Sequence, residues 1–228
     1  MDCAVIRHVA FEDLGCWEST LAEHGYAVTY LEAGVDDLAP FAGADLGIVL
    51  GGPIGVSDAH EFPTIDAEIA LLRGRMEADL PTLGVCLGLQ FMAAALGAEV
   101  TSGEVEFGWH EIELLPGADA TPLRHVAGVP MLLWHGDSAA LPEGATRWAR
   151  TDATEVQAFT YGRSFAVQFH PEIHHERFEQ WIIGNMKELR DLGVDIPALR
   201  VEVAARGPAS VAASRAMLGE WLEAVAGR

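Results

Sequence analysis

The sequence predicts a three-layer α/β fold in which a mostly parallel central sheet is flanked by helices. Short apolar runs alternate with segments of helical spacing through roughly the first hundred residues. The apolar runs are almost continuous, which is typical of strands that a parallel sheet buries on both faces. Hydrophobic residues make up 50% of the 228 residues, so the chain can bury a large core.

The elements of the first half follow one another along the chain, and glycine and proline close several of them. Gly25 ends a helical segment, and Gly51, Gly52 and Pro53 end an apolar run. The expected elements are a strand at 4–9, a helix at 13–24, strands at 26–31 and 46–50, a helix at 65–76, a strand at 81–86 and a helix at 87–96.

Beyond Glu99 the chain changes to short strand candidates separated by turn signals. We expect them to complete the same sheet or to form a small antiparallel flap. The candidates lie at 105–115, 130–134, 146–149, 156–160 and 165–169. After Pro171 helical spacing returns, and it predicts helices at 176–189 and, beyond Gly207 and Pro208, at 209–225.

The charge of the chain excludes several partners. Its formal net charge is -20, with only 14 lysines and arginines. Binding to phosphate groups needs a basic face, so we predict neither nucleic acid nor an anionic membrane surface as a partner. No signal-peptide pattern opens the sequence, and no apolar run reaches about 18 residues. We therefore expect a soluble, cytoplasmic protein.

The three cysteines, Cys3, Cys16 and Cys86, have no paired spacing, which favours free thiols over disulfides or a zinc site. The alternative is a metal site formed by Glu172 and the three histidines between residues 170 and 175. Neither HExxH nor HxE with a distant CxxC occurs, so the usual hydrolytic zinc geometry is missing. We predict no metal and no cofactor.

Cys86 lies in the stretch GVCLG, where a buried strand is expected to end and a helix to begin. Glycines two places before and after it allow the sharp turn of a nucleophile elbow. The positive end of the helix dipole favours the thiolate, and the amide of Leu87 is free to face an oxyanion. The alternative is a small buried side chain, as many free cysteines are.

A thiol nucleophile needs a base, and the stretch AVQFHPEI supplies a candidate. His170 is expected at the end of a strand, and Glu172 lies two residues on, which places both on the same side of an extended chain. Pro171 stiffens the segment. Taken singly, His170 can equally be a surface or capping histidine and Glu172 a carboxylate at a helix N-terminus.

The turn at GGP offers a further candidate. Two glycines let backbone amides approach a ligand closely, so Gly52 could supply a second oxyanion donor, although GGP is also an ordinary turn.

GGP, GVCLGLQ and FHPE, in this order, resemble the class I glutamine amidotransferases over about residues 45–175. The resemblance implies a flavodoxin-like class I glutamine amidotransferase domain at 1–190, with a C-terminal helical extension at 191–228 packed on the same domain. It implies that Cys86 is the nucleophile, His170 the base and later the acid, and Glu172 the residue that orients it.

The same resemblance assigns the remaining site residues. Gly52 and Leu87 correspond to the oxyanion donors, and Gly51 and Gln90 to residues that hold the substrate. The stretches EFGWHEIEL (106–114) and LLWHGDS (132–138) are similar to stand-alone relatives of the glutaminase domain of GMP synthetase. They imply that His135 and Asp137 lie near the amino acid head of the substrate.

The implied reaction is hydrolysis of the glutamine side-chain amide through a γ-glutamyl thioester. One departure is Gly55, where relatives commonly carry serine. No synthetase segment is recognised after the glutaminase-like region, so we expect the ammonia to pass to a partner synthetase. Two alternatives stay open: a hydrolase of γ-glutamyl peptides or amines that acts alone, and a non-catalytic regulatory or binding subunit.

Overall fold

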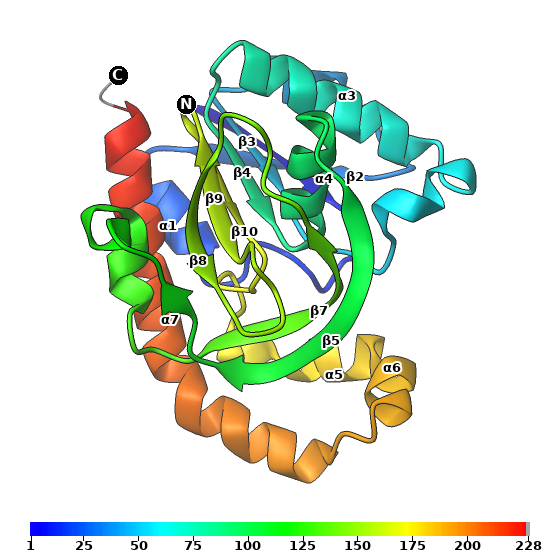
Figure 1. Ribbon diagram of the computed structural model, residues 1–228, viewed down its shortest axis with the longest axis vertical. Helices are drawn as coiled ribbons and strands as arrows, with labels where there is room; N and C mark the ends of the chain where they lie inside the picture. Colours follow the sequence, from blue (N-terminus) through cyan, green and yellow to red (C-terminus); the bar gives the residue numbers. More distant parts are fainter. Residues whose placement is uncertain (227–228) are drawn as a thin grey trace.

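A computed structural model describes residues 1–226 and shows a central sheet between layers of helices (Figure 1). The strands of the main sheet are β1 (Asp2–Arg7), β2 (Ala27–Glu32), β3 (Leu46–Val49), β4 (Thr82–Val85), β6 (Glu113–Leu114), β8 (Thr146–Arg150), β9 (Ala158–Tyr161) and β10 (Ser164–Val167). Their order is β2-β1-β3-β4-β10-β9-β8-β6. The strands from β2 to β10 in this order are parallel, and the last three continue the sheet antiparallel. The predicted α/β fold with a mostly parallel sheet is confirmed.

The helices divide between the two faces of the sheet and one end of it. They are α1 (Trp17–Glu23), α2 (Ala39–Gly43), α3 (Thr64–Glu77), α4 (Leu87–Ala95), α5 (Glu179–Gly184), α6 (Met186–Asp191) and α7 (Ile196–Ala226). Trp17 of α1 and Trp221 of α7 belong to the core on one face. Phe41 of α2, Leu72 of α3 and Phe91 of α4 belong to the core on the other. Burial of these large side chains is the main stabilising contribution to the layered arrangement.

A second, two-stranded sheet lies beside the main one. It consists of β5 (Val100–His110) and β7 (Met131–Ala139), which pair antiparallel with an irregular register between Ser102 and Glu106. Figure 1 shows it as a long curved ribbon near α5. Trp109 and Trp134 on this ribbon share a third apolar cluster with Trp181 of α5. Both expected outcomes for the second half therefore occur, because some strands extend the main sheet and others form an antiparallel flap.

The predicted start of the last helix is wrong. A break at Gly207 and Pro208 was expected, but α7 runs through both residues from Ile196 onward. Gly207 lies so close to His175 that a side chain there would clash, and both halves of α7 are buried, through Leu199 and Trp221. This packing on both sides of Pro208 outweighs the loss of one helical hydrogen bond.

The predicted helix at 176–189 is also wrong as a single element. The structure has a 3₁₀ turn at His175–Arg177, followed by α5 and α6. The break falls at Gly184, where a side chain would clash with the ring of Phe11. Contact with the loop after β1 therefore decides where α5 ends.

Two further boundaries differ. The helix expected at 13–24 covers only Trp17–Glu23, because Gly15 and Cys16 pack against the backbone of Glu172. The short helix α2 is absent from the sequence expectations.

The division into a domain at 1–190 and an extension at 191–228 stays a prediction, and residues 227–228 of that extension lie outside the described residues. No helix within residues 1–226 is long and apolar enough to cross a membrane.

Candidate active site

A cavity of about 430 Å³ lies at the carboxyl ends of the parallel strands β3, β4 and β10. Ligand sites of open α/β sheets commonly lie at this edge. The structure brings together seven of the nine predicted site residues around it: Cys86, His170, Gly52, Leu87, Gln90, His135 and Asp137. Glu172 lies behind His170, and Gly51 lies behind the cavity wall.

Cys86 occupies the sharp turn between β4 and α4. Its backbone has φ of +51° and ψ of -106°, a left-handed conformation that costs about 1–3 kcal/mol for a non-glycine residue. A side chain at Gly84 would clash with α4, and one at Gly88 with the carbonyl of Val49. The expected reason for the two glycines is confirmed. The turn points Sγ of Cys86 into the cavity, 3.7 Å from the carbonyl oxygen of Trp134.

His170 and Glu172 form a buried pair directly after β10. The His170 backbone amide donates to the carbonyl of Leu132 at 2.8 Å, which fixes the segment against β7. Nδ1 of His170 donates to Oε1 of Glu172 at 2.8 Å, so the other side of the ring is turned toward Cys86. Burial opposes the charged imidazole, but the charges and hydrogen bonds of Glu172 and Cys86 outweigh it and raise the pKa of His170 well above its ordinary value of 6.5.

The loop between β1 and α1 holds Glu172 in place. The amide of Cys16 donates to the carbonyl of Glu172 at 2.8 Å, and Gly15, with φ of +49°, allows that approach because a side chain there would clash with the same carbonyl. Trp181 packs edge-on against the ring of His170, with 5.1 Å between the ring centres. The pair of His170 and Glu172 is thus fixed from two sides.

Two residues that line the cavity have backbone amides without a protein acceptor among residues 1–226. Within residues 1–226, neither the N–H of Gly52 nor that of Leu87 donates to a protein atom, and both residues line the cavity. The turn at Gly52 is held through His8, whose Nδ1 donates to the carbonyl of Gly51 at 2.9 Å. Nε2 of His8 lies 3.0 Å from Oε2 of Glu68, and this pair is buried as well.

The ribbon supplies the opposite wall of the cavity. Nε2 of Gln90 donates to the carbonyl of Asp137 at 3.3 Å, and Nδ1 of His135 donates to the same carbonyl at 3.1 Å. The hydroxyl of Ser102 donates to Oδ1 of Asp137 at 2.9 Å. At Gly55, a side-chain carbon would lie 2.8 Å from Oδ2 of Asp137, so the Asp137 carboxylate takes up space that a serine there would need.

His135 is fixed from behind by Glu106, whose Oε2 lies 3.3 Å from Nε2 of the histidine. Burial raises the pKa of Glu106, but hydrogen bonds from His135, Thr154 and Thr151 outweigh it and hold the pKa at about 2. Glu106 is therefore a stable anion that orients the ring.

Comparison with known proteins identifies the family. The profile described as glutamine amidotransferase class-I matches residues 10–188. The chain belongs to this family. The glutamine amidotransferase-like protein YfeJ of Salmonella typhimurium is 31% identical over 195 residues, which cover 82% of each chain. A glutamine amidotransferase structure from Thermotoga maritima has a TM-score of 0.89 at 30% identity and covers 98% of each chain.

Other relatives of this class I amidotransferase are longer proteins. GMP synthase [glutamine-hydrolyzing] of Shewanella amazonensis is 37% identical over 161 residues, which are 64% of this chain and 28% of that enzyme. The chain therefore matches little more than a quarter of that synthase, and the resemblance seen in the sequence motifs is confirmed at the level of the family.

The structure of this amidotransferase also shows site residues that the sequence analysis missed. Glu12 lines the cavity, and so do Asn185 and Glu188 at the start of α6. His8 directly follows β1, whose carboxyl end lies beside that of β3, and Glu12 lies farther along the same loop. A histidine at the end of a buried parallel strand was the signal that could have found His8, whereas the place of Glu12 depends on the strand order. Within residues 1–226, no group of three or more His, Cys, Asp or Glu side chains is placed to hold a metal ion.

Proposed function

We propose that this protein hydrolyses the side-chain amide of glutamine through Cys86, His170 and Glu172, and releases glutamate and ammonia. The observation that carries the proposal is the joint geometry at the strand ends. A cysteine on a strained elbow lies beside a histidine that a buried glutamate orients. Family membership supports a glutamine-hydrolysing role in general.

In the proposed mechanism, the Cys86 thiolate attacks the amide carbon of the substrate. The amides of Gly52 and Leu87 stabilise the oxyanion in this proposal, since both residues line the cavity and neither amide has an acceptor among residues 1–226. His170 protonates the departing nitrogen and then removes a proton from the water that cleaves the γ-glutamyl thioester. Glu172 holds the ring and stabilises its charged form.

Binding of the amino acid head is assigned to the ribbon wall. Asp137 presents a carboxylate that fits the α-ammonium group, and Gln90 and His135 fix it through the Asp137 carbonyl. Gly51 contributes indirectly in this proposal, because its carbonyl anchors the oxyanion turn to His8.

We assign the ammonia to a partner synthetase, on the basis of relatives that are named as glutamine-hydrolysing GMP synthases. We propose a cytoplasmic location, because Cys3, Cys16 and Cys86 are free thiols, which suit a reducing compartment.

The test is release of glutamate and ammonia from glutamine by the purified protein. We expect Cys86→Ala to lose turnover by at least about 10³-fold. The matched control is Cys3→Ala, which removes another buried thiol, in β1, and should keep turnover. A chloroketone analogue of glutamine should label Cys86 and no other cysteine, as read by mass spectrometry.

Turnover that survives in Cys86→Ala would overturn the assignment of the nucleophile. A protein that neither turns over glutamine nor reacts with the chloroketone would be a binding subunit and would refute the proposed reaction.

A further inference from the structure

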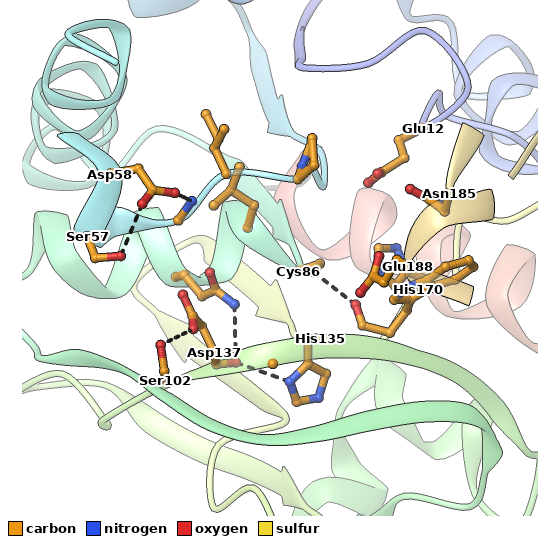
Figure 2. A pocket seen from close by; sticks show the side chains of 18 of the residues that line it. Glu12, Ser57, Asp58, Cys86, Ser102, His135, Asp137, His170, Asn185 and Glu188 are labelled. Atoms are coloured by element: carbon orange, nitrogen blue, oxygen red, sulfur yellow. Dashed lines mark hydrogen bonds between the residues drawn. The ribbon is translucent and has the colours of Figure 1, made fainter. Parts of the chain in front are cut away.

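The cavity has two ends on either side of Cys86 (Figure 2). On one side lie four polar residues near the proposed site of the substrate head, namely Ser57, Asp58, Ser102 and Asp137. On the other side lie Glu12, Asn185 and Glu188, close to His170. We call these two sets the glutamyl end and the leaving-group end, because His170 protonates the nitrogen that departs.

Glu12 is the unusual group of the leaving-group end. It is only 7% exposed, yet within residues 1–226 its carboxylate accepts no hydrogen bond and joins no ion pair. Figure 2 shows the side chain directed into the cavity. Buried carboxylates without partners are rare because desolvation of the charge is costly. The Glu12 side chain borders the cavity, so a ligand bound there can supply the missing donor.

The position of Glu12 places that missing donor beside the departing nitrogen. Its Oε2 fills the space where a side chain at Gly51 would project, and Cε1 of His170 borders the same space. The carboxylates of the glutamyl end differ, because Asp58 accepts from the amide of Gly55 at 2.9 Å and Asp137 accepts from Ser102. Among residues 1–226, the carboxylates of the leaving-group end, Glu12 and Glu188, therefore differ from those of the glutamyl end in having no protein donor.

The charges around the cavity select the sign of the ligand. Four carboxylates line it, those of Glu12, Asp58, Asp137 and Glu188, and no lysine or arginine among residues 1–226 does. At the glutamyl end, the α-ammonium group of the substrate head balances the negative charge of the carboxylates. The carboxylates of the leaving-group end favour a second cation and repel an anion.

We propose that the leaving-group end is a subsite for a cationic amine, so that the preferred substrate is the γ-glutamyl amide of a short diamine. The inference rests on the proposed Cys86 chemistry and narrows its substrate class. The distal ammonium of the diamine donates to Glu12, and Asn185 and Glu188 complete its surroundings.

The reaction balances without any further reagent. The bond between Sγ of Cys86 and the γ-carbon forms, and the bond from that carbon to the diamine nitrogen breaks. His170 gives the nitrogen its proton, and the diamine leaves. Water then cleaves the thioester, so one γ-glutamyl amide and one water yield glutamate and a free diamine.

The charge state of Glu12 supplies a second readout. Burial raises the pKa of Glu12 to about 7, with Glu172 and Glu188 adding to the rise and His170 and His8 opposing it. A cation bound beside Glu12 favours the ionised carboxylate, so binding near neutral pH should release protons.

The experiment compares glutamine with three γ-glutamyl amides of matched length: those of 1,4-diaminobutane, which is cationic, of pentylamine, which is neutral, and of 4-aminobutanoate, which is anionic. We expect kcat/KM to be highest for the cationic amide, lower for the neutral amide and lowest for the anionic amide. The cationic amide should be preferred over the neutral one by about tenfold or more. Glu12→Gln should reduce this preference to about threefold or less. The control Glu143→Gln removes an equal charge from an exposed position outside the cavity and should keep the preference.

Binding is measured in parallel by calorimetry on Cys86→Ala, in two buffers near pH 7 that differ in ionisation enthalpy. The cationic amide should bind more tightly than the neutral one and release protons, and the release should vanish in the Cys86→Ala, Glu12→Gln double variant.

Each result decides between the two proposals. Cys86-dependent glutamine hydrolysis with equal rates for all three amides overturns the subsite and leaves the proposed function standing. No Cys86-dependent turnover, together with tighter binding of the cationic amide, overturns the reaction and keeps the subsite. If Glu12→Gln weakens the neutral and cationic amides equally, Glu12 binds the glutamyl group instead, and the inference is wrong.

Discussion

The pairs His170–Glu172 and His8–Glu68 consist of the same two side chains in different surroundings. Both are buried, with nitrogen–oxygen distances of 2.8 Å and 3.0 Å. They differ at the second ring nitrogen. That of His170 is turned toward Cys86 at the cavity, whereas that of His8 is bound to the carbonyl of Gly51.

This difference separates the histidine that we propose to be catalytic, His170, from one that positions a turn, His8. A buried glutamate orients either ring, but only a ring with one free nitrogen at the cavity can take and return a proton. Both nitrogens of His8 face acceptors, so His8 fastens the turn at Gly52 and has no capacity left for proton transfer. Whether a buried histidine can transfer a proton is therefore indicated by the neighbour of its second nitrogen and not by its glutamate partner.

The largest expected effect compares His170→Asn with His8→Asn. Asparagine cannot replace the nitrogen that faces Cys86, so His170→Asn should lower kcat for glutamine by about 10³–10⁴-fold. At position 8 the asparagine amide can still donate to Gly51, and we expect kcat to stay within about tenfold of the wild type.

The loss of stability should run the other way. Asparagine at position 170 can still donate to Oε1 of Glu172 in place of Nδ1, whereas asparagine at position 8 leaves Oε2 of the buried Glu68 without its histidine partner. We therefore expect the free energy of unfolding, measured by urea denaturation, to fall by about 3 kcal/mol in His8→Asn and by less in His170→Asn. Equal losses of turnover would show that the second nitrogen does not distinguish the two pairs.

A smaller effect sharpens the comparison on the glutamate side. Since the Glu172 carboxylate raises the pKa of His170, Glu172→Gln should lower that pKa and reduce kcat by about 10²-fold or more. The pKa is measured by NMR titration of the imidazole. The control Glu68→Gln should leave the pKa of His170 unchanged. An unchanged pKa of His170 in Glu172→Gln would contradict the role assigned to Glu172.

The smallest effect concerns Glu12, whose pKa responds to both pairs. The folded protein holds the proton of Glu12 up to about pH 7, compared with the ordinary value of 4.5, so the wild type loses stability as the pH rises through this window. Glu12→Gln removes that loss. We expect the variant to be more stable than the wild type by on the order of 2–3 kcal/mol near pH 8 and about equally stable near pH 4.

Chemical denaturation across that pH range measures the difference. A stability gain that is independent of pH would show that Glu12 does not carry the raised pKa.

Much of the fold and the family motifs could be predicted because their signals are local. Cys86 and His170 each follow a short apolar run, and glycines mark the elbow around Cys86 within five residues of sequence. Such patterns report directly on strand ends and sharp turns.

The surroundings of those motifs depend on contacts between distant segments. The pairing of His8 with Glu68 requires β1 to lie beside β3 and α3 to cover that face, which periodicity does not reveal. The continuity of α7 through Pro208 likewise comes from packing at both ends of the helix. Glu12 was missed for the same reason, because the loop that carries it reads as surface until the strand order is known.

The left-handed backbone at Cys86 has an evolutionary consequence. Glycine adopts that conformation without penalty, so at this position the replacement that relieves strain is also one that ends thiol chemistry. Under the proposed function, selection for stability and selection for turnover therefore pull in opposite directions at Cys86. The conformation that presents the thiol is held at a cost in stability that a glycine would not carry.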